Sequence, residues 1–355
     1  MVYVRTDANS TIATGHMMRC ITVSKKMRER GQNVVFLVSD ENSVFLLKDS
    51  EFDYIVLNTC WKCLGSADEI RKMKSILINE YDKSFNKPLL IVDSYYVDNS
   101  YFNQLKDYSR IAYFDDLANE VYNVDYLINY NIFSNTIDYE NMYMTKKTKC
   151  FIGPKYTPLR EQFSFDVSRC FFIPSDEKRL SVLLTCGGGD NINILENFIN
   201  AILDRDNRFV NFIIVIGLYN NNYRKLQKII QRNQNISLMY NVKDMADVMK
   251  CCDLAISSAG TVLYECASTG LPTIFFSLAD NQLLDAECFG NIPGMYYIGD
   301  IREKKEEKIS TILSIMDDLI NNPNERMEMS MNMRRIIDGD GANRIANALC
   351  RLEER

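Results

Sequence analysis

Short, wholly apolar segments alternate with amphipathic segments along this chain, and the alternation occurs in two successive blocks. The runs Val34–Val38 and Leu89–Val92 contain no polar residue at all. Strands that are buried on both faces of a parallel sheet have this composition, whereas half-exposed strands alternate apolar and polar residues. We therefore predict two α/β units, each with a parallel sheet and right-handed crossovers.

The boundary between the two units is predicted where the alternation weakens, between residues 131 and 178. Ser134–Lys149 is polar, and Pro154, Pro158 and Pro174 interrupt the residues around and beyond it. At 355 residues the chain is long for one hydrophobic core. We predict an N-terminal domain at 1–150, a connection at 151–178, a C-terminal domain at 179–338 and a closing helix at 339–355.

Composition limits which partners the protein is expected to bind and in which compartment it is expected to occur. The net charge of −6 leaves no basic excess with which to bind a nucleic acid polymer. No apolar run approaches the roughly 20 residues that span a bilayer, so no membrane span is expected. The segment Met1–Asp7 lacks the features of a signal peptide, and eleven cysteines then indicate reduced thiols and a cytoplasmic protein.

The chain contains a single histidine, His16. Histidine is the side chain whose ordinary pKa lies nearest neutrality, so it is the one candidate for an imidazole base. It opens the predicted helix His16–Arg30, after the loop Asp7–Gly15 that leaves the first predicted strand, Val2–Thr6. Ligands of open α/β sheets bind at this edge, and the helix dipole there favours a neutral ring. A structural histidine packed at a helix start explains the same position equally well.

A second candidate site is the run of small residues Ser258-Ala259-Gly260-Thr261, where a predicted strand leads directly into a helix. Free N–H groups at Gly260 and Thr261, together with the helix dipole, would bind a diphosphate. Hydroxyl groups of Ser258 and Thr261 add donors, and Glu265, one turn later, could accept hydrogen bonds from a ribose diol. Simple capping of the helix by Ser258 is the plainer alternative.

Three further motifs are less specific. The glycines of Thr185-Cys186-Gly187-Gly188-Gly189-Asp190 could expose N–H groups to an anion or form a tight turn. Asp115-Asp116 comes after a predicted strand and could orient sugar hydroxyls or a water, although Asp116 could also cap the next segment of the chain. Cys60-Trp61-Lys62-Cys63 has thioredoxin-like spacing without the expected setting, and we predict a loop with incidental thiols.

Several segments, in collinear order over nearly the whole chain, resemble one family. They are Thr6–Cys20, Asp93-Ser94-Tyr95, Asp115–Asn119, Asp125–Asn129, Gly153–Phe163, Ser258–Glu265, Asp280-Asn281-Gln282 and Asp338–Ile345. The set resembles the UDP-2,4-diacetamido-2,4,6-trideoxy-β-L-altropyranose hydrolases of pseudaminic acid biosynthesis, relatives of the UDP-GlcNAc transferase of peptidoglycan synthesis. Ser94 and Tyr122 stand where that family often has histidine, so the sugar-binding side departs from the pattern.

The resemblance implies a GT-B fold, with two Rossmann-type domains facing a cleft, and a UDP-sugar substrate. It implies that the N-terminal domain uses His16 as the base that activates water for inverting hydrolysis, with Asp7, Tyr95 and Asp115 positioning sugar or water. The implied UDP-binding residues are Gly187, Gly188, Ser258, Ala259, Gly260, Thr261, Glu265 and Asn281. Because no metal-ligand cluster is visible, we expect a reaction without metal or other cofactor.

Two alternatives stay open at this point. In an inverting GT-B glycosyltransferase, His16 would deprotonate an acceptor hydroxyl instead of water. A non-enzymatic UDP-sugar binder would use the same diphosphate site without turnover. The sequence does not identify the sugar or the oligomeric state.

Overall fold

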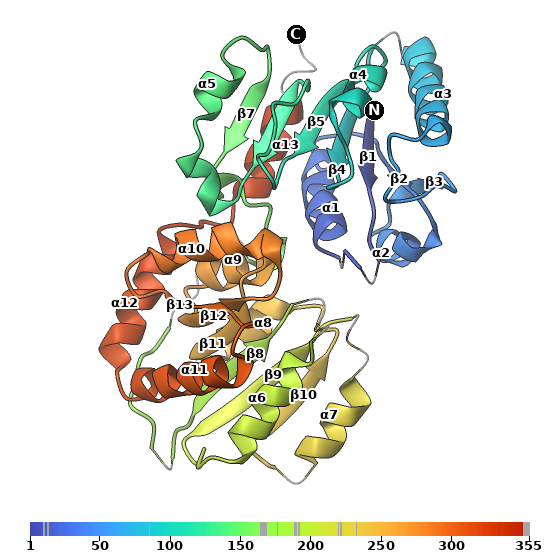
Figure 1. Ribbon diagram of the computed structural model, residues 1–355. Coiled ribbons are helices and arrows are strands. Elements are labelled where there is room, and N and C mark those ends of the chain that lie inside the picture. Colours follow the sequence, from blue (N-terminus) through green and yellow to red (C-terminus); the bar gives the residue numbers. More distant parts are fainter. Residues whose placement is uncertain are drawn as a thin grey trace. The chain divides into compact units, whose positions relative to one another are not determined.

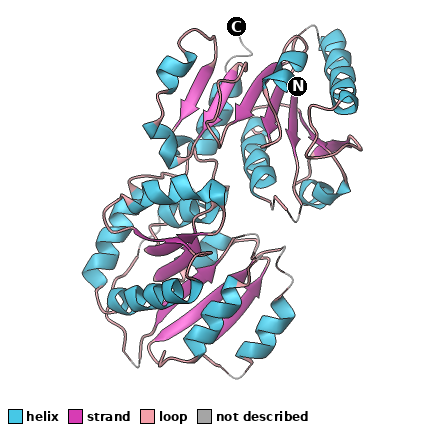
Figure 2. Ribbon diagram, in the orientation of Figure 1, coloured by secondary structure: helices cyan, strands magenta, loops and turns pink. Residues whose placement is uncertain are grey.

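The computed structural model describes residues 1–9, 11–12, 14–84, 86–163, 169–175, 177–187, 190, 192–218, 220, 222–231 and 233–350. The chain divides into two compact units. Unit 1 comprises Met1–Arg160 and the chain from Asp340 onward, and unit 2 comprises Glu161–Gly339. Each unit is a parallel sheet flanked by helices (Figures 1 and 2), which confirms the predicted α/β class.

Unit 1 contains a seven-stranded sheet in the order β3-β2-β1-β4-β5-β6-β7. Every neighbouring pair is parallel. The strands are β1 (Val2–Thr6), β2 (Val34–Val38), β3 (Asp53–Val56), β4 (Leu89–Asp93), β5 (Arg110–Phe114), β6 (Tyr126–Asn129) and β7 (Lys149–Ile152). The α-helices are α1 (Gly15–Arg28), α2 (Val44–Asp49), α3 (Ala67–Ser84), α4 (Asn99–Leu105), α5 (Tyr139–Tyr143) and α13 (Gly341–Cys350).

The C-terminal helix α13 packs against α1 and so returns the end of the chain to unit 1. Gly341 begins α13 directly against the backbone of Thr157, where a β-carbon would have no room. Arg30, just after α1, donates from Nε to Asn347 Oδ1 at 2.7 Å. The closing helix predicted from the sequence therefore packs on the N-terminal sheet unit.

Unit 2 contains a six-stranded parallel sheet in the order β10-β9-β8-β11-β12-β13. Its strands are β8 (Leu180–Thr185), β9 (Val210–Ile216), β10 (Ile236–Tyr240), β11 (Leu254–Ser258), β12 (Thr273–Ser277) and β13 (Tyr296–Asp300). Its α-helices are α6 (Ile194–Leu203), α7 (Tyr223–Ile230), α8 (Met245–Lys250), α9 (Thr261–Ser268), α10 (Leu283–Gly290), α11 (Lys305–Ile320) and α12 (Pro323–Arg334). No helix of the described residues is long and apolar enough to cross a lipid bilayer.

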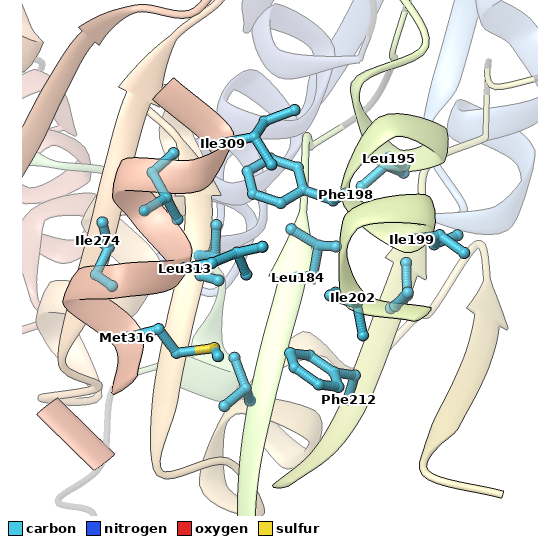
Figure 3. Close-up of a cluster of buried hydrophobic side chains, with 14 of the residues drawn as sticks. Leu184, Leu195, Phe198, Ile199, Ile202, Phe212, Ile274, Ile309, Leu313 and Met316 are labelled. Carbon is cyan, nitrogen blue, oxygen red and sulfur yellow. The ribbon is translucent and has the colours of Figure 1, made fainter. Parts of the chain in front are cut away.

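The core of unit 2 shows why the chain forms these layers. Side chains of α6 and α11 meet over the sheet (Figure 3), with Phe198 and Leu313 almost completely buried against Leu184 of β8. Burying an apolar side chain of this size contributes roughly 1.5–3 kcal/mol. The sheet of unit 2 is therefore covered by helices on this face, as a parallel sheet requires.

The sequence prediction omitted β6, β7 and β13. β7 falls where a polar connection was expected, and its four residues are exposed or half-buried. β13 is half-buried along its length and forms the other sheet's edge. Short strands and edge strands lack a long apolar run, so periodicity does not detect them. The units divide between Arg160 and Glu161, and again between Gly339 and Asp340.

Candidate functional site

The first six strands of unit 1 have the same order as the six strands of unit 2. In both sheets the chain reverses its direction of progress next to the first strand of the unit. In unit 1 this occurs between β1 and β4, and in unit 2 between β8 and β11. Ligands of open α/β sheets bind outside the carboxyl ends of strands at such a switch point. The residues just after β1, β4, β8 and β11 are therefore the first to consider.

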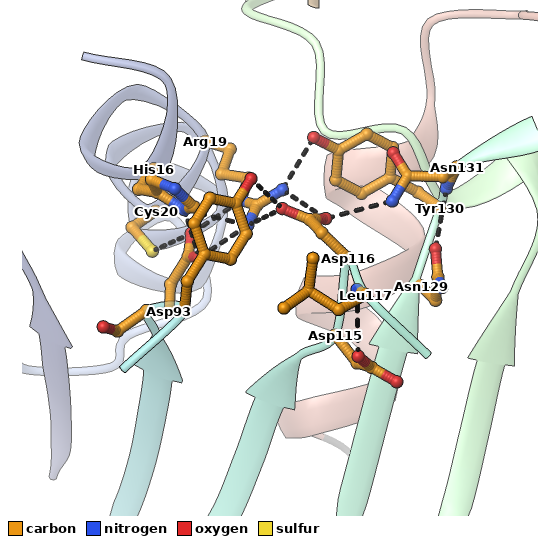
Figure 4. Close-up of polar contacts among 12 residues, drawn as sticks. His16, Arg19, Cys20, Asp93, Asp115, Asp116, Leu117, Asn129, Tyr130 and Asn131 are labelled. Carbon is orange, nitrogen blue, oxygen red and sulfur yellow. Dashed lines mark hydrogen bonds and ion pairs between the residues drawn. The ribbon is translucent and has the colours of Figure 1, made fainter. Parts of the chain in front are cut away.

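At the switch point of unit 1, His16 in the first turn of α1 meets Asp93 at the end of β4 (Figure 4). His16 Nδ1 lies 2.6 Å from Asp93 Oδ1. Burial by itself would raise the pKa of Asp93, but the positive charge of Arg19, with His16, holds that pKa well below its usual range. An ionised carboxylate only accepts hydrogen bonds, so Nδ1 carries the proton and donates. The Nε2 lone pair is then available as a base.

Arg19 connects this pair to the next strand. It donates to Asp93 from Nε at 2.6 Å, and its two terminal nitrogens each lie 2.8 Å from an oxygen of Asp116, after β5. Asn131 Nδ2 and the Tyr95 hydroxyl also donate to Asp116, at 3.0 and 3.2 Å. A buried guanidinium is stable only with such partners, so the arrangement fixes α1 against β4 and β5.

His16 also borders a pocket within unit 1. The pocket is lined by residues that include Asp7, Ile12, His16, Trp61, Tyr95 and Tyr96. The Tyr95 ring contacts the imidazole edge to face, with 4.5 Å between ring centroids. The geometry thus combines an oriented imidazole with a partly aromatic wall.

Asp7 and Asp115 lie differently from His16. Asp7 reaches the pocket, but its carboxylate accepts from the Arg5 guanidinium at 2.6 Å and from the Ser39 backbone N–H at 2.7 Å. Asp115 accepts from the backbone N–H groups of Leu117 and Ala118, at 3.2 and 2.9 Å. Burial raises the pKa of Asp115 to about 6.

Of the two neighbouring carboxylates, Asp116 joins the His16 network and Asp115 shapes the turn after β5 (Figure 4). The sequence had instead predicted the positioning role for Asp115, with helix capping as an alternative for Asp116. In extended backbone, successive side chains point to opposite sides, so neighbouring aspartates at a strand end enter different environments. Which one faces the histidine depends on strand register, which the motif does not reveal.

At the switch point of unit 2, α9 begins at Thr261 with Gly260 as its N-cap and without a side-chain hydrogen bond to the cap. Ser258 is the buried last residue of β11 and does not cap the helix, so the plainer alternative for this serine is wrong. Ala259 is also buried, and its N–H donates to Phe276 O on β12 at 2.8 Å. The N-terminus of a helix is a place where backbone N–H groups can bind an anion.

The other predicted UDP-binding residues lie at different places in unit 2. Gly187 has a φ of +70°, and a β-carbon there would lie 3.7 Å from Val262 Cγ2, so the loop after β8 approaches the first turn of α9. Glu265 is buried on the same helix. Asn281 is exposed in the turn Asp280–Gln282. Gly188 lies outside the described residues.

Asp93, Arg19 and Asn131 were not among the site residues predicted from the sequence. Two signals were present: Asp93 ends an otherwise apolar strand, and Arg19 comes three residues after His16, which places both on one helix face. Asn131 has no such signal. Within the part of the chain that the structure describes, no three His, Cys, Asp or Glu side chains form a metal-ligand group.

Sequence comparisons agree with the motifs. A family model described as lipid-A-disaccharide synthetase matches residues 117–278. The chain is 25% identical over 267 residues to the UDP-2,4-diacetamido-2,4,6-trideoxy-beta-L-altropyranose hydrolase of Campylobacter jejuni, covering 74% of this chain and 86% of that protein. It is 27% identical over 293 residues to a Helicobacter pylori protein named as a pseudaminic acid cytidylyltransferase and the same hydrolase, covering 82% of this chain.

The chain spans only part of several relatives. It covers 47% of the Helicobacter pylori protein. It covers 57% of an uncharacterized Methanocaldococcus jannaschii protein that is 25% identical over 81% of this chain.

Solved structures show the fold. MurG of Acinetobacter baumannii superposes with a TM-score of 0.67 at 16% identity, covering 99% of this chain and 100% of that one. UDP-GlcNAc 2-epimerase of Neisseria meningitidis, bound to UDP-GlcNAc, has a TM-score of 0.63 at 15% identity, with coverage of 99% and 100%. The chain therefore has a GT-B fold, and the resemblance to the UDP-diacetamido-trideoxy-altropyranose hydrolases that its motifs predicted is confirmed.

Proposed function

We propose that this protein hydrolyses a UDP-linked diacetamido-trideoxy sugar or a related amino sugar, with release of UDP and the free sugar. The observation that carries the proposal is the imidazole of His16, oriented by Asp93 and bordering a pocket at the switch point of unit 1. The names of the Campylobacter jejuni and Helicobacter pylori relatives support the same substrate class and a place in pseudaminic acid biosynthesis.

Water activation is assigned to His16. Its Nε2 takes a proton from a water molecule while the water oxygen bonds to the anomeric carbon, and Asp93 stabilises the imidazolium that forms. The anomeric C–O bond breaks and its electron pair leaves with UDP. Attack from the face opposite the leaving group inverts the anomeric centre, as in inverting glycosidases. The proton on His16 then passes to solvent.

Leaving-group stabilisation is assigned to unit 2. The N–H groups at the start of α9 are donors for the diphosphate, whose negative charge grows as the C–O bond breaks. Gly187 lets the loop after β8 lie close to α9, because any other residue would be strained at its positive φ. Glu265 is assigned to the ribose hydroxyls.

Arg19 is assigned a positioning role. It holds the Asp93 carboxylate through two hydrogen bonds and balances its charge, so that Asp93 stays ionised and Nδ1 of His16 stays protonated. Asp116 in turn pairs with Arg19, while Tyr95 contacts both Asp116 and the imidazole. These contacts restrict the motion of the ring, which supports the role of a positioned base proposed for it.

The test is turnover of a panel of UDP-amino sugars, followed by NMR of the anomeric proton. We expect His16→Asn to lower kcat by ~10²–10⁴, the usual effect of losing a general base. Binding of UDP, measured by calorimetry, is expected to persist because its donors lie on other residues. Lys26→Gln, on the same helix, is the matched control.

Two outcomes contradict the proposal. A His16→Asn protein with near wild-type turnover would remove His16 from the chemistry. Release of UDP only when an acceptor alcohol is added, with a glycoside as product, would identify a glycosyltransferase instead.

A further inference from the structure

The loop between β3 and α3 contains two exposed thiols on either side of a residue that lines the His16 pocket. Cys60 and Cys63 are both exposed, and Trp61 between them belongs to the pocket wall. Trp61 contacts Tyr96, also in that wall, with 5.2 Å between ring centroids. From the sequence alone these cysteines are interpreted as incidental, because spacing does not reveal what Trp61 contacts.

The backbone already brings the two cysteines together. Cys63 N donates to Cys60 O at 2.9 Å, so the four residues form a hydrogen-bonded turn. The first and last Cα atoms of such a turn lie within about 7 Å. A disulfide needs Cα atoms roughly 4.4–6.8 Å apart, so closure requires little movement of the chain.

The turn is anchored on both sides. Before it, Thr59 N donates to Ser39 O of unit 1 at 3.0 Å, and the Thr59 hydroxyl donates to Glu69. After it, Leu64 is completely buried. Because its ends are held, a new bond between the thiols must be accommodated within the turn itself, and that places the change at Trp61.

We propose that Cys60 and Cys63 form a dithiol site that reacts reversibly with low-molecular-weight disulfides, and that its closure alters the Trp61 wall of the His16 pocket. Cys60 thiolate attacks a sulfur of the incoming disulfide, forms a mixed disulfide and releases one thiol. Cys63 then attacks Cys60 Sγ, closes the Cys60–Cys63 bond and releases the second thiol. Two protein thiols are oxidised and one external disulfide is reduced.

The environment distinguishes the two sulfurs and supports this order of attack. A hydrogen bond from the Lys62 backbone, with one from Cys63, lowers the pKa of Cys60. The hydrogen bond with Cys60 raises the pKa of Cys63. By contrast, burial raises the pKa of the Cys20 and Cys186 thiols well above the usual range. Exposed thiols of lowered pKa react first, so Cys60 is the attacking thiol.

The chain supplies its own probe, because Trp61 is its only tryptophan. The full chain is equilibrated in mixtures of reduced and oxidised glutathione, followed by tryptophan fluorescence and by peptide mapping without reduction. We expect a Cys60–Cys63 disulfide and a fluorescence change that excess thiol reverses. Cys63→Ser is expected to retain glutathione on Cys60, while Cys60→Ser reacts about tenfold more slowly at position 63.

Cys170→Ser is the matched control, since Cys170 is an exposed thiol of unit 2. It is expected to behave as the wild type. The site is disproved if Cys60 and Cys63 remain thiols in oxidised glutathione, or if Cys170 reacts as fast as Cys60. A disulfide that forms without any change in Trp61 fluorescence disproves the effect on the pocket.

The consequence for turnover rests on the proposed function. Oxidation is expected to raise KM for the UDP-sugar roughly tenfold, the size of effect expected from one altered sugar contact. The double variant Cys60→Ser/Cys63→Ser should lose this sensitivity to glutathione disulfide. An unchanged KM in fully oxidised wild type would disprove this consequence. Mapping and fluorescence do not depend on turnover, so failure of the proposed function leaves the test of the dithiol site intact.

Discussion

The two switch points use polar groups in opposite ways. In unit 1, the charged side chains around His16 bind one another: Arg19 lies between Asp93 and Asp116, and Asp93 also holds the imidazole. In unit 2, α9 begins without a side-chain cap. In the first arrangement the charged groups pair within the protein, whereas the N-cap of α9 is a glycine, which supplies no side-chain acceptor.

Helix α6 shows that the fold does not require a helix start without a side-chain cap. Asp190, after β8, accepts from the N–H groups of Ile194 and Leu195 at 2.7 and 2.9 Å, so its carboxylate occupies the start of α6. A side-chain cap is worth about 1 kcal/mol, and α9 does without it. The two helix starts therefore differ: a carboxylate binds the first N–H groups of α6, whereas the N-cap residue of α9 supplies no such group.

The largest effect is expected from Asp93→Asn. The amide can donate to Nδ1 of His16, which would move the ring proton to Nε2 and remove the base. We expect kcat to fall by about 10²–10⁴, as for the loss of an orienting carboxylate in a histidine-dependent site. Steady-state kinetics of Asp93→Asn, His16→Asn and the double variant measure this. Since the residues act together, the double variant should be no worse than His16→Asn, and additive losses would contradict the pairing.

The next largest effect, on UDP affinity, is expected from a substitution at the start of α9. Gly260→Asp would place a carboxylate at the N-cap of α9, imitating Asp190. The backbone φ of −105° accepts it, and the space around the glycine is adequate for a β-carbon. We expect the dissociation constant for UDP to rise about ten- to hundredfold, because a like charge at this half-buried position opposes the diphosphate by about 1.4–2.7 kcal/mol.

Calorimetry with UDP measures this, with Gly260→Ala as the control for the loss of glycine. If Gly260→Asp binds UDP as tightly as Gly260→Ala does, α9 is not the diphosphate site.

A smaller effect, on the pH dependence of stability, is expected from Asp115→Asn, and it tests whether Asp115 and Asp116 have different roles. Burial raises the pKa of Asp115 to about 6, above the ordinary value near 4. The folded protein therefore holds this proton at a pH where the unfolded chain has lost it, and stability falls as pH rises from about 4 through 6. Asp115→Asn keeps an oxygen for the Leu117 and Ala118 N–H groups but cannot ionise. Its stability relative to wild type should be higher at pH 8 than at pH 4.5 by about 2 kcal/mol.

Urea unfolding at both pH values measures the difference. A stability gap that does not vary with pH would show that Asp115 titrates normally. A loss of kcat in Asp115→Asn comparable to that of His16→Asn would instead make it part of the reacting site.

The smallest effect is expected from Asp190→Ala, which would make α6 resemble α9. Losing this cap should cost about 1 kcal/mol in the free energy of unfolding, measured in urea. UDP affinity should change far less than in Gly260→Asp. A larger change in UDP binding than in stability would mean that α6, too, has a part in the ligand site.

The sequence predicted most of the fold because its central strands are buried on both faces. Strand β1 has the predicted bounds, and the two wholly apolar runs lie in β2 and β4. The edge strands β7 and β13 were not detected, because half-exposed strands mix residue types. Position at strand ends made His16 and the start of α9 candidates, but it did not reveal the partners of His16.

By itself, the sequence determined two parallel-sheet units and one available imidazole, because composition and local periodicity encode which faces are buried and which side chains exist. The tertiary structure decided that His16 meets Asp93, 77 residues away, and that Asp116 rather than Asp115 completes the network. It also decided that α9 has no side-chain cap and that Trp61 lines the pocket. These outcomes depend on strand order and register, which bring distant residues together through the packing of whole elements.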